Sequence, residues 1–158
     1  MKNLFLLFAL VLCMGVVNAQ SESEAANVRV GISHDGSPAV GENAKLQISV
    51  VPKAGWHVYS AIPSEEGAYE PALVDFEITS AGFTLVEGLK EEGSMHSEYD
   101  DIMGGMLRYY EGNVIFTQEI KITEGEVVAV GSFEYMACND FKCIPLLSEF
   151  KVSATAAE

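Results

Sequence analysis

Apolar and polar residues alternate with a period of two along most of the chain after residue 27. This period is typical of β-strands with one buried face, and no segment longer than about a dozen residues keeps a helical period. The alternation predicts strands over residues 28–33, 45–50, 55–60, 74–78, 83–86, 114–122, 127–136 and 144–152. Glycine- and proline-containing turns separate them. Short strands at this spacing predict an all-β fold, an immunoglobulin-like antiparallel β-sandwich.

One segment interrupts the alternation. Residues 88–105 are rich in charge, glycine and methionine and show no regular period. The pattern predicts a long loop here, and long loops in compact domains are often functional.

The first residues have the composition of an export signal. Lys2 precedes an apolar run over residues 4–17, and Val17-Asn18-Ala19 provides a small-residue cleavage site. The apolar run is short for a membrane-spanning helix and no basic residues follow it. The sequence therefore predicts a cleaved signal peptide at residues 1–19, a flexible polar leader at 20–27 and one domain at 28–158. No membrane insertion is expected after cleavage.

The charge of the chain excludes several classes of partner. The net charge is −14, with 23 acidic and 9 basic residues. Cleavage would remove Lys2 and leave a charge near −15. Such a field repels nucleic acid and anionic lipid surfaces, so neither is an expected partner. Most of this charge is expected to solvate the surface.

Two cysteines lie outside the predicted signal peptide, in the segment YMACNDFKCIP (135–145). Export would place Cys138 and Cys143 where a disulfide persists. A closed loop of about six residues stabilises a fold by only about 2 kcal/mol. Local disulfides are often the reducible and reactive ones. Spacing alone leaves a structural bridge and a redox pair both open. Lys142 favours the Cys143 thiolate and Asp140 opposes ionisation of both cysteines, so local charge does not identify the nucleophile.

A copper site is a further hypothesis. His96 lies near Met95, Met103 and Met106, and soft sulfur ligands together with imidazole suit copper. A blue-copper site would need a histidine shortly after its cysteine, and none follows Cys143. We therefore predict no metal and no other cofactor.

The cysteine segment and two others resemble a known family in the same order along the chain. GWHVYS (55–60), DDIMGGMLRYYEGNVIF (100–116) and YMACNDFKCIP together resemble the N-terminal periplasmic domain of the thiol:disulfide interchange protein DsbD. The resemblance covers roughly residues 28–152. It implies an immunoglobulin-like fold and a periplasmic thiol–disulfide exchange function, that of a protein-disulfide reductase component.

The resemblance also implies partners and site residues. The expected electron donor is a membrane-embedded thiol transporter, and the expected acceptors are periplasmic disulfide isomerases and the thioredoxin-like proteins of cytochrome c maturation. Cys143 matches the cysteine that forms the mixed disulfide, and Cys138 matches the resolving partner. The predicted surroundings of this pair are His57, Tyr59, Asp140, Lys142 and Pro145. The predicted cap loop is Asp101, Ile102, Met103, Gly104 and Gly105, followed by the aromatic Tyr110.

The chain departs from the family pattern at three points. Four residues separate the cysteines where the best-known members have five, and Met103 and Gly104 replace the aromatic residues of the cap. The resemblance does not extend to a membrane domain or a thioredoxin-like domain, so the donor is expected to be a separate protein. A monomer is expected. The main alternative is a non-catalytic envelope β-sandwich that binds another protein and carries a structural disulfide.

Overall fold

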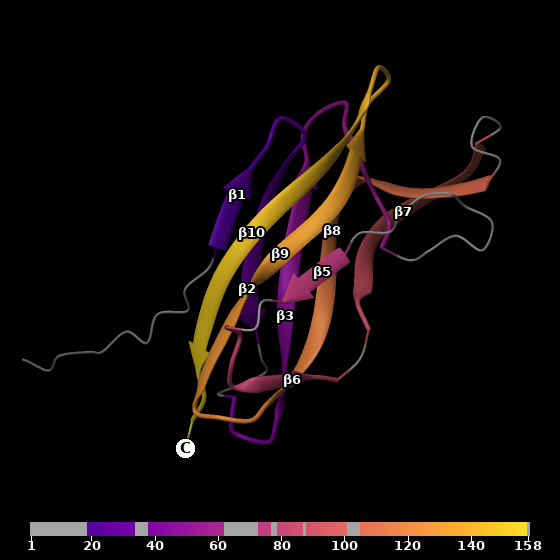
Figure 1. Cartoon of the computed structure of the whole chain (residues 1–158). Coiled ribbons are helices and arrows are strands. Elements are labelled where there is room, and N and C mark those ends of the chain that lie inside the picture. The colour runs from indigo at the N-terminus through magenta and orange to yellow at the C-terminus, as the bar shows by residue number, and fades with distance from the viewer. Residues whose placement is uncertain are drawn as a thin grey trace, which may run out of the picture.

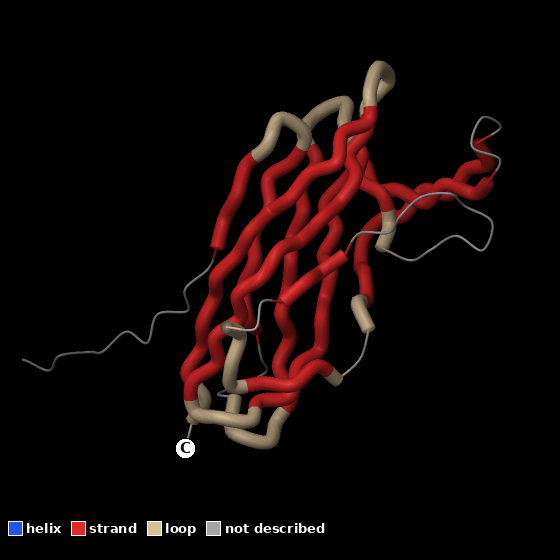
Figure 2. Tube along the Cα trace, in the orientation of Figure 1, coloured by secondary structure: helices blue, strands red, loops and turns tan. Residues whose placement is uncertain are grey.

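A computed structural model of the chain describes residues 19–33, 38–61, 73–76, 79–86, 88–100 and 105–157. Every regular element in these ranges is a β-strand, and the named strands all pair antiparallel (Figures 1 and 2). No helix in this part of the chain has the length and apolarity needed to cross a membrane. The strands are β1 (Ala19–Glu22), β2 (Ala26–Ser33), β3 (Asn43–Pro52), β4 (His57–Tyr59), β5 (Leu73–Phe76), β6 (Phe83–Leu85), β7 (Lys90–Asp100), β8 (Gly105–Ile122), β9 (Glu126–Cys138) and β10 (Cys143–Thr155).

The strands form two layers that face each other. β1, β2, β3 and β8 follow one another in one layer, and β6 also pairs with β8. β5, β9 and β10 form the second layer, which lies in front of β2, β3 and β8 in Figure 1. The short strand β4 pairs with both β8 and β9 and so joins the layers at one end. This arrangement confirms the predicted immunoglobulin-like β-sandwich.

The core lies between the layers because alternate residues of the long strands β2, β3, β8, β9 and β10 point inward. Phe116 of β8 and Phe133 of β9 meet with ring centroids 5.0 Å apart, and Tyr135 stacks on Phe133 at 5.1 Å. Removing such apolar surface from water is the main stabilising term in folding. The other large side chains that are almost fully buried are Leu46, Ile48, Ile120, Ile122, Val28, Val50, Val58, Val114, Val127 and Val152.

The prediction of a long loop at residues 88–105 is wrong. β7 occupies residues 90–100 and pairs with β8, which begins at Gly105. Alternation failed to reveal β7 because residues 92–99 are all exposed, so the strand has no buried face to mark in the sequence. Backbone pairing, which the sequence pattern does not record, forms the strand instead.

The outer part of this hairpin leaves the body of the sandwich. We call residues 96–100 of β7 and 105–109 of β8 the arm. The register between β7 and β8 shifts between Gly93 and Met95, just before the arm begins. Figures 1 and 2 show the two strands projecting sideways from the end of the sandwich at which the β9–β10 hairpin also ends.

The structure also differs from the flexible leader predicted at residues 20–27. β1 pairs with β2 from Ala19↔Val30 to Glu22↔Asn27, and Ala25 and Ala26 are fully buried. The hydroxyl of Ser23 accepts hydrogen bonds from the backbone N–H groups of both alanines and closes the turn. Polar composition suggested disorder, whereas edge pairing and two small buried residues order the segment. The rest of the predicted signal peptide, residues 1–18, lies outside the described residues.

Candidate active site

Cys138 ends β9 and Cys143 begins β10, and the two residues face each other directly across the hairpin. They form a disulfide with an S–S distance of 2.02 Å and a Cα–Cα distance of 4.0 Å. Asn139 builds the connecting turn, because its N–H donates to the Lys142 carbonyl at 2.9 Å and its side-chain oxygen accepts from the N–H groups of Phe141 and Lys142. An asparagine that bonds the backbone two residues on is typical of tight turns. Four residues between the cysteines therefore suffice to bring them together.

The two cysteines differ in their access to solvent. Cys138 is only 2% exposed, whereas Cys143 is exposed. Thiol–disulfide exchange requires a thiolate to reach one sulfur of the disulfide, so access decides which sulfur is attacked. Cys143 presents the accessible side of this disulfide.

Cys138 belongs to a small apolar cluster separate from the main core. Tyr59 and Leu107 are its buried members, and Tyr109 and Met136 pack against it. Tyr59, predicted to surround the cysteine pair, thus packs beside Cys138. Leu107, Tyr109 and Met136 were missed by sequence reasoning. Extending the β8 alternation back from residue 114 would have placed 107 and 109 on one face of a strand.

His57 is the cross-strand partner of Cys138, through the pairing of β4 with β9. Its imidazole lies in a row of rings. The Tyr109 ring is 4.6 Å from it, the Tyr59 ring is 5.5 Å away edge-on, and His96 stacks on Tyr109 at 5.3 Å. The rings of Tyr59 on β4 and Tyr109 on β8 lie against the histidine beside the buried cysteine.

Burial and charge act in opposite directions on His57. Its half-buried position lowers the pKa of the imidazole below the ordinary value of 6.5, because desolvation disfavours the charged form. The carboxylates of Glu111, Glu98 and Asp140 raise this pKa, but by less than burial lowers it. Glu98 also accepts a hydrogen bond from the Tyr109 hydroxyl, whose pKa is raised chiefly by burial. The site therefore holds a histidine that favours its neutral form.

Lys142 is held at the side of the hairpin. Its ammonium forms an ion pair with the Glu24 carboxylate, at 3.0 and 3.1 Å from the two oxygens. It also lies 5.5 Å from the centre of the Trp56 ring. Trp56 itself packs against the main core. The lysine thus links the cysteine hairpin to the β1–β2 turn through Glu24 and to the residue before β4 through Trp56.

The predicted cap aromatic Tyr110 is not at the disulfide. It is 2% exposed in the main core, and its hydroxyl is hydrogen-bonded to Glu91. Burial is the main reason that its pKa is raised well above the usual range. Successive residues of a strand point to opposite faces, so Tyr109, and not Tyr110, faces Cys138.

The other predicted site residues divide by position. Asp140 lies exposed in the turn between the cysteines, and Pro145 lies exposed two residues beyond Cys143, paired with Met136. Gly105 is buried at the start of β8 in the arm. The remaining cap-loop prediction, residues 101–104, lies outside the described residues.

The metal hypothesis gains no support from side-chain placement. Within the described ranges, no three His, Cys, Asp or Glu side chains come close enough to hold a metal ion. The thiols that a copper site would need are joined in the disulfide.

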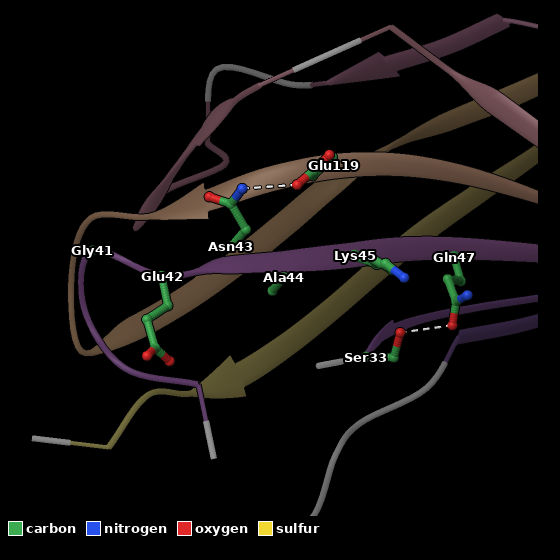
Figure 3. A pocket seen from close by; sticks show the side chains of 8 residues that line it. All are labelled: Ser33, Gly41, Glu42, Asn43, Ala44, Lys45, Gln47 and Glu119. Carbon is green, nitrogen blue, oxygen red and sulfur yellow. Dashed lines mark hydrogen bonds between the residues drawn. The ribbon is translucent and has the colours of Figure 1, made fainter. Parts of the chain in front are cut away.

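A polar groove lies at the opposite end of the sandwich. It is lined by residues around the start of β3 and by Glu119 of β8 (Figure 3). Asn43 donates to Glu119 at 2.7 Å, and Ser33 donates to Gln47 at 2.6 Å. These polar groups bond each other across an open surface, so the groove offers no reactive centre. The disulfide end remains the candidate active site.

The sequence matches a family model described as thiol:disulfide interchange protein DsbD, N-terminal, over residues 25–154. A fold of this class with a disulfide-bonded cysteine pair, one member of which is exposed, is that of a thiol–disulfide interchange domain. The chain belongs to the DsbD N-terminal domain family. No curated protein matches it in a sequence search.

Three solved structures resemble the fold. The N-terminal periplasmic domain of ScsB from Proteus mirabilis shares 17% identity at a TM-score of 0.54, over 90% of this chain and 50% of that one. The chain therefore spans half the length of that structure. The DsbD N-terminal domain of Neisseria meningitidis in its reduced form shares 13% identity at a TM-score of 0.43, over 80% of this chain and 86% of that one. The GAE domain of GGA2p from Saccharomyces cerevisiae shares 7% identity at a TM-score of 0.44, over 85% of this chain and 94% of that one. At 17% identity, the likeness to the ScsB domain shows the fold alone.

Proposed function

We propose that this chain is a periplasmic thiol–disulfide exchange domain that passes electrons through the Cys138–Cys143 pair. The observation that carries the proposal is the unequal exposure of two directly opposed cysteines in a member of this family. The bridge joins two strands that already pair over thirteen residues from Cys143 to Thr155. It therefore constrains little that the backbone does not already fix, and a purely structural purpose explains it poorly.

The unequal exposure supports a different task for each cysteine. In the reduced domain, the Cys143 thiolate attacks a disulfide of the acceptor and forms a mixed disulfide, and one acceptor sulfur leaves as a thiolate. Cys138 then attacks Cys143, which closes the intramolecular disulfide and releases the second acceptor thiolate. Two electrons pass to the acceptor. The reverse sequence with a membrane-embedded thiol transporter restores the dithiol.

The acceptors we propose are thioredoxin-like proteins of the periplasm, including disulfide isomerases and those of cytochrome c maturation. The surface beside Cys143 supports docking of a protein. Phe141 in the hairpin turn is 93% exposed, which is unusual for so large an apolar side chain. Aromatic residues at the centre of an interface often contribute much of its binding energy. The signal peptide at residues 1–19 belongs to this proposal, since it would deliver the domain to the periplasm.

A trapping experiment tests the proposal. Cys138→Ser leaves Cys143 without a resolving partner, so mixed disulfides with acceptors should accumulate in the periplasm and disappear on treatment with dithiothreitol. Cys143→Ser is the matched control, because it keeps one cysteine but removes the accessible one. Trapping by neither variant, together with an unchanged phenotype for the double serine variant, would support a non-catalytic module instead.

A further inference from the structure

We propose that His57 accepts the proton of Cys138 when this cysteine resolves a mixed disulfide. The inference rests on the exchange function proposed above and adds a proton acceptor to it. The juxtaposition that carries it is the direct pairing of His57 on β4 with Cys138 on β9. Side chains of directly paired antiparallel residues project from the same face of the sheet and lie close together.

Cys138 needs such a group because of its surroundings. It is 2% exposed and packs with Tyr59, Leu107 and Met136. Burial among apolar groups disfavours a thiolate, and the thiolate is the reactive form. The resolving step therefore requires a nearby atom that takes the thiol proton as the sulfur attacks.

The environment of His57 suits a proton acceptor. Burial keeps the imidazole mainly neutral, so a ring nitrogen is free of a proton. Three carboxylates, Glu98 on β7, Glu111 on β8 and Asp140 in the turn, favour the imidazolium once it forms. The other titratable groups around this row are the hydroxyls of Tyr59 and Tyr109 and the imidazole of His96. The Lys142 ammonium is paired with Glu24.

The step balances as follows. The Cys138 thiol proton moves to His57, and the Cys138 sulfur attacks the Cys143 sulfur of the mixed disulfide. The Cys138–Cys143 bond forms, the bond between Cys143 and the partner sulfur breaks, and the partner leaves as a thiolate with the electron pair. The imidazolium then returns its proton to solvent or to that thiolate. The cysteine pair is oxidised and the partner is reduced.

The two exchange steps can be followed separately with the aromatic disulfide reagent DTNB. The reduced protein should release one coloured thiolate when Cys143 attacks the reagent and a second when Cys138 resolves the adduct. We expect His57→Tyr to slow the second release by about 100-fold near neutral pH and to leave the first unchanged. A tyrosine can keep a ring between Tyr59 and Tyr109 but has no basic nitrogen. His57→Gln provides a second variant should the larger ring disturb folding.

His96→Gln is the matched control. It removes an imidazole that stacks on the same Tyr109 ring but does not pair with Cys138. Both releases should keep their wild-type rates in this variant. A second release that keeps its rate in both His57 variants, or that slows together with the first, would overturn the inference. Failure of the first release in the wild-type protein would instead overturn the exchange function itself.

Discussion

Cys138 and Cys143 are cross-strand partners whose Cα atoms are 4.0 Å apart, yet one is buried and the other exposed. The asymmetry arises because the two strands end in different surroundings. β9 ends against β4 and the apolar cluster around Tyr59, whereas β10 begins at the open side of the hairpin. A single hairpin therefore produces one protected and one accessible sulfur.

Alkylation of the reduced protein should reveal this asymmetry directly. We expect iodoacetamide to modify Cys143 at least about tenfold faster than Cys138, because thiol reactivity follows both thiolate character and exposure. Peptide mapping by mass spectrometry at short reaction times measures the two rates. Equal rates in the folded protein, followed by no change on unfolding in urea, would show that the exposure difference does not control access.

Phe133 should be a main determinant of stability. It is fully buried and contacts both Phe116 and Tyr135 between the layers. We expect Phe133→Ala to lower the free energy of unfolding by about 3–5 kcal/mol, measured by urea denaturation. Phe141→Ala is the control of the same chemistry on the surface, and its effect should remain within about 0.5 kcal/mol.

Phe141 should contribute to binding of the partner protein and not to stability. If this exposed ring enters the interface beside Cys143, Phe141→Ser should raise the KM for a thioredoxin-like acceptor several-fold while leaving the DTNB reaction of Cys143 unchanged. The small reagent needs no docking surface, so it reports chemistry alone. Leu147→Ser, an exposed apolar residue further along β10, is the matched control and should leave the KM unchanged. A KM that does not respond to Phe141→Ser would place the interface elsewhere.

Glu24 should influence the reactivity of Cys143 through Lys142. Lys142 directly precedes Cys143 in the sequence, and its ammonium lies 3.0 Å from the Glu24 carboxylate, which offsets its positive charge. Glu24→Gln removes the negative charge and should lower the thiol pKa of Cys143, since a nearby unbalanced cation favours the thiolate. The pH dependence of alkylation in a Cys138→Ser background measures this.

Glu22→Gln is the control for Glu24. Glu22 is an exposed acidic residue close to Glu24 in the sequence, and it pairs with Lys53 at 2.7 Å, away from the cysteine hairpin. An equal effect of both substitutions would indicate a general change in net charge. Because the Glu24–Lys142 pair is exposed, its loss should cost less than about 1 kcal/mol of stability.

His57 should make stability depend on pH. Its pKa is lower in the folded protein than the ordinary 6.5, so the unfolded chain binds the proton first as the pH falls. Stability from the neutral imidazole is therefore fully present above the ordinary value and is lost as the pH falls through it toward the folded pKa. In His57→Tyr, the loss of unfolding free energy between about pH 7.5 and about pH 5.5 should be smaller than in the wild-type protein. An equal or larger loss in the variant would contradict the direction of the shift.

The strands with a buried face were predictable because burial imposes a period of two on the sequence. Phe116, Phe133 and their alternating neighbours follow from that constraint, as does the sandwich that they fill. The cysteine pair was equally visible, since four residues between two cysteines at a strand end leave a turn as the natural connection. Its resemblance to the DsbD N-terminal domain then predicted Cys138 and Cys143 as the chemical centre.

The surroundings of that centre were only partly predictable. Tyr109 and Tyr110 are adjacent in the sequence, and the resemblance that favoured Tyr110 could not tell which of them faces the cysteines. β7 could not be recognised from the alternation because residues 92–99 are all exposed, and its backbone pairing with β8 leaves no period in the sequence.

By itself, the sequence determined the buried faces of the strands, the β-sandwich and the disulfide, because each depends on local periodicity or on residues close together in the chain. Tertiary structure alone decided which cysteine is accessible and which residue lies opposite Cys138. His57 reaches that position through a strand pairing between residues 57 and 138. No local pattern encodes such a register, since it follows from how β4 closes the end of the sandwich between β8 and β9.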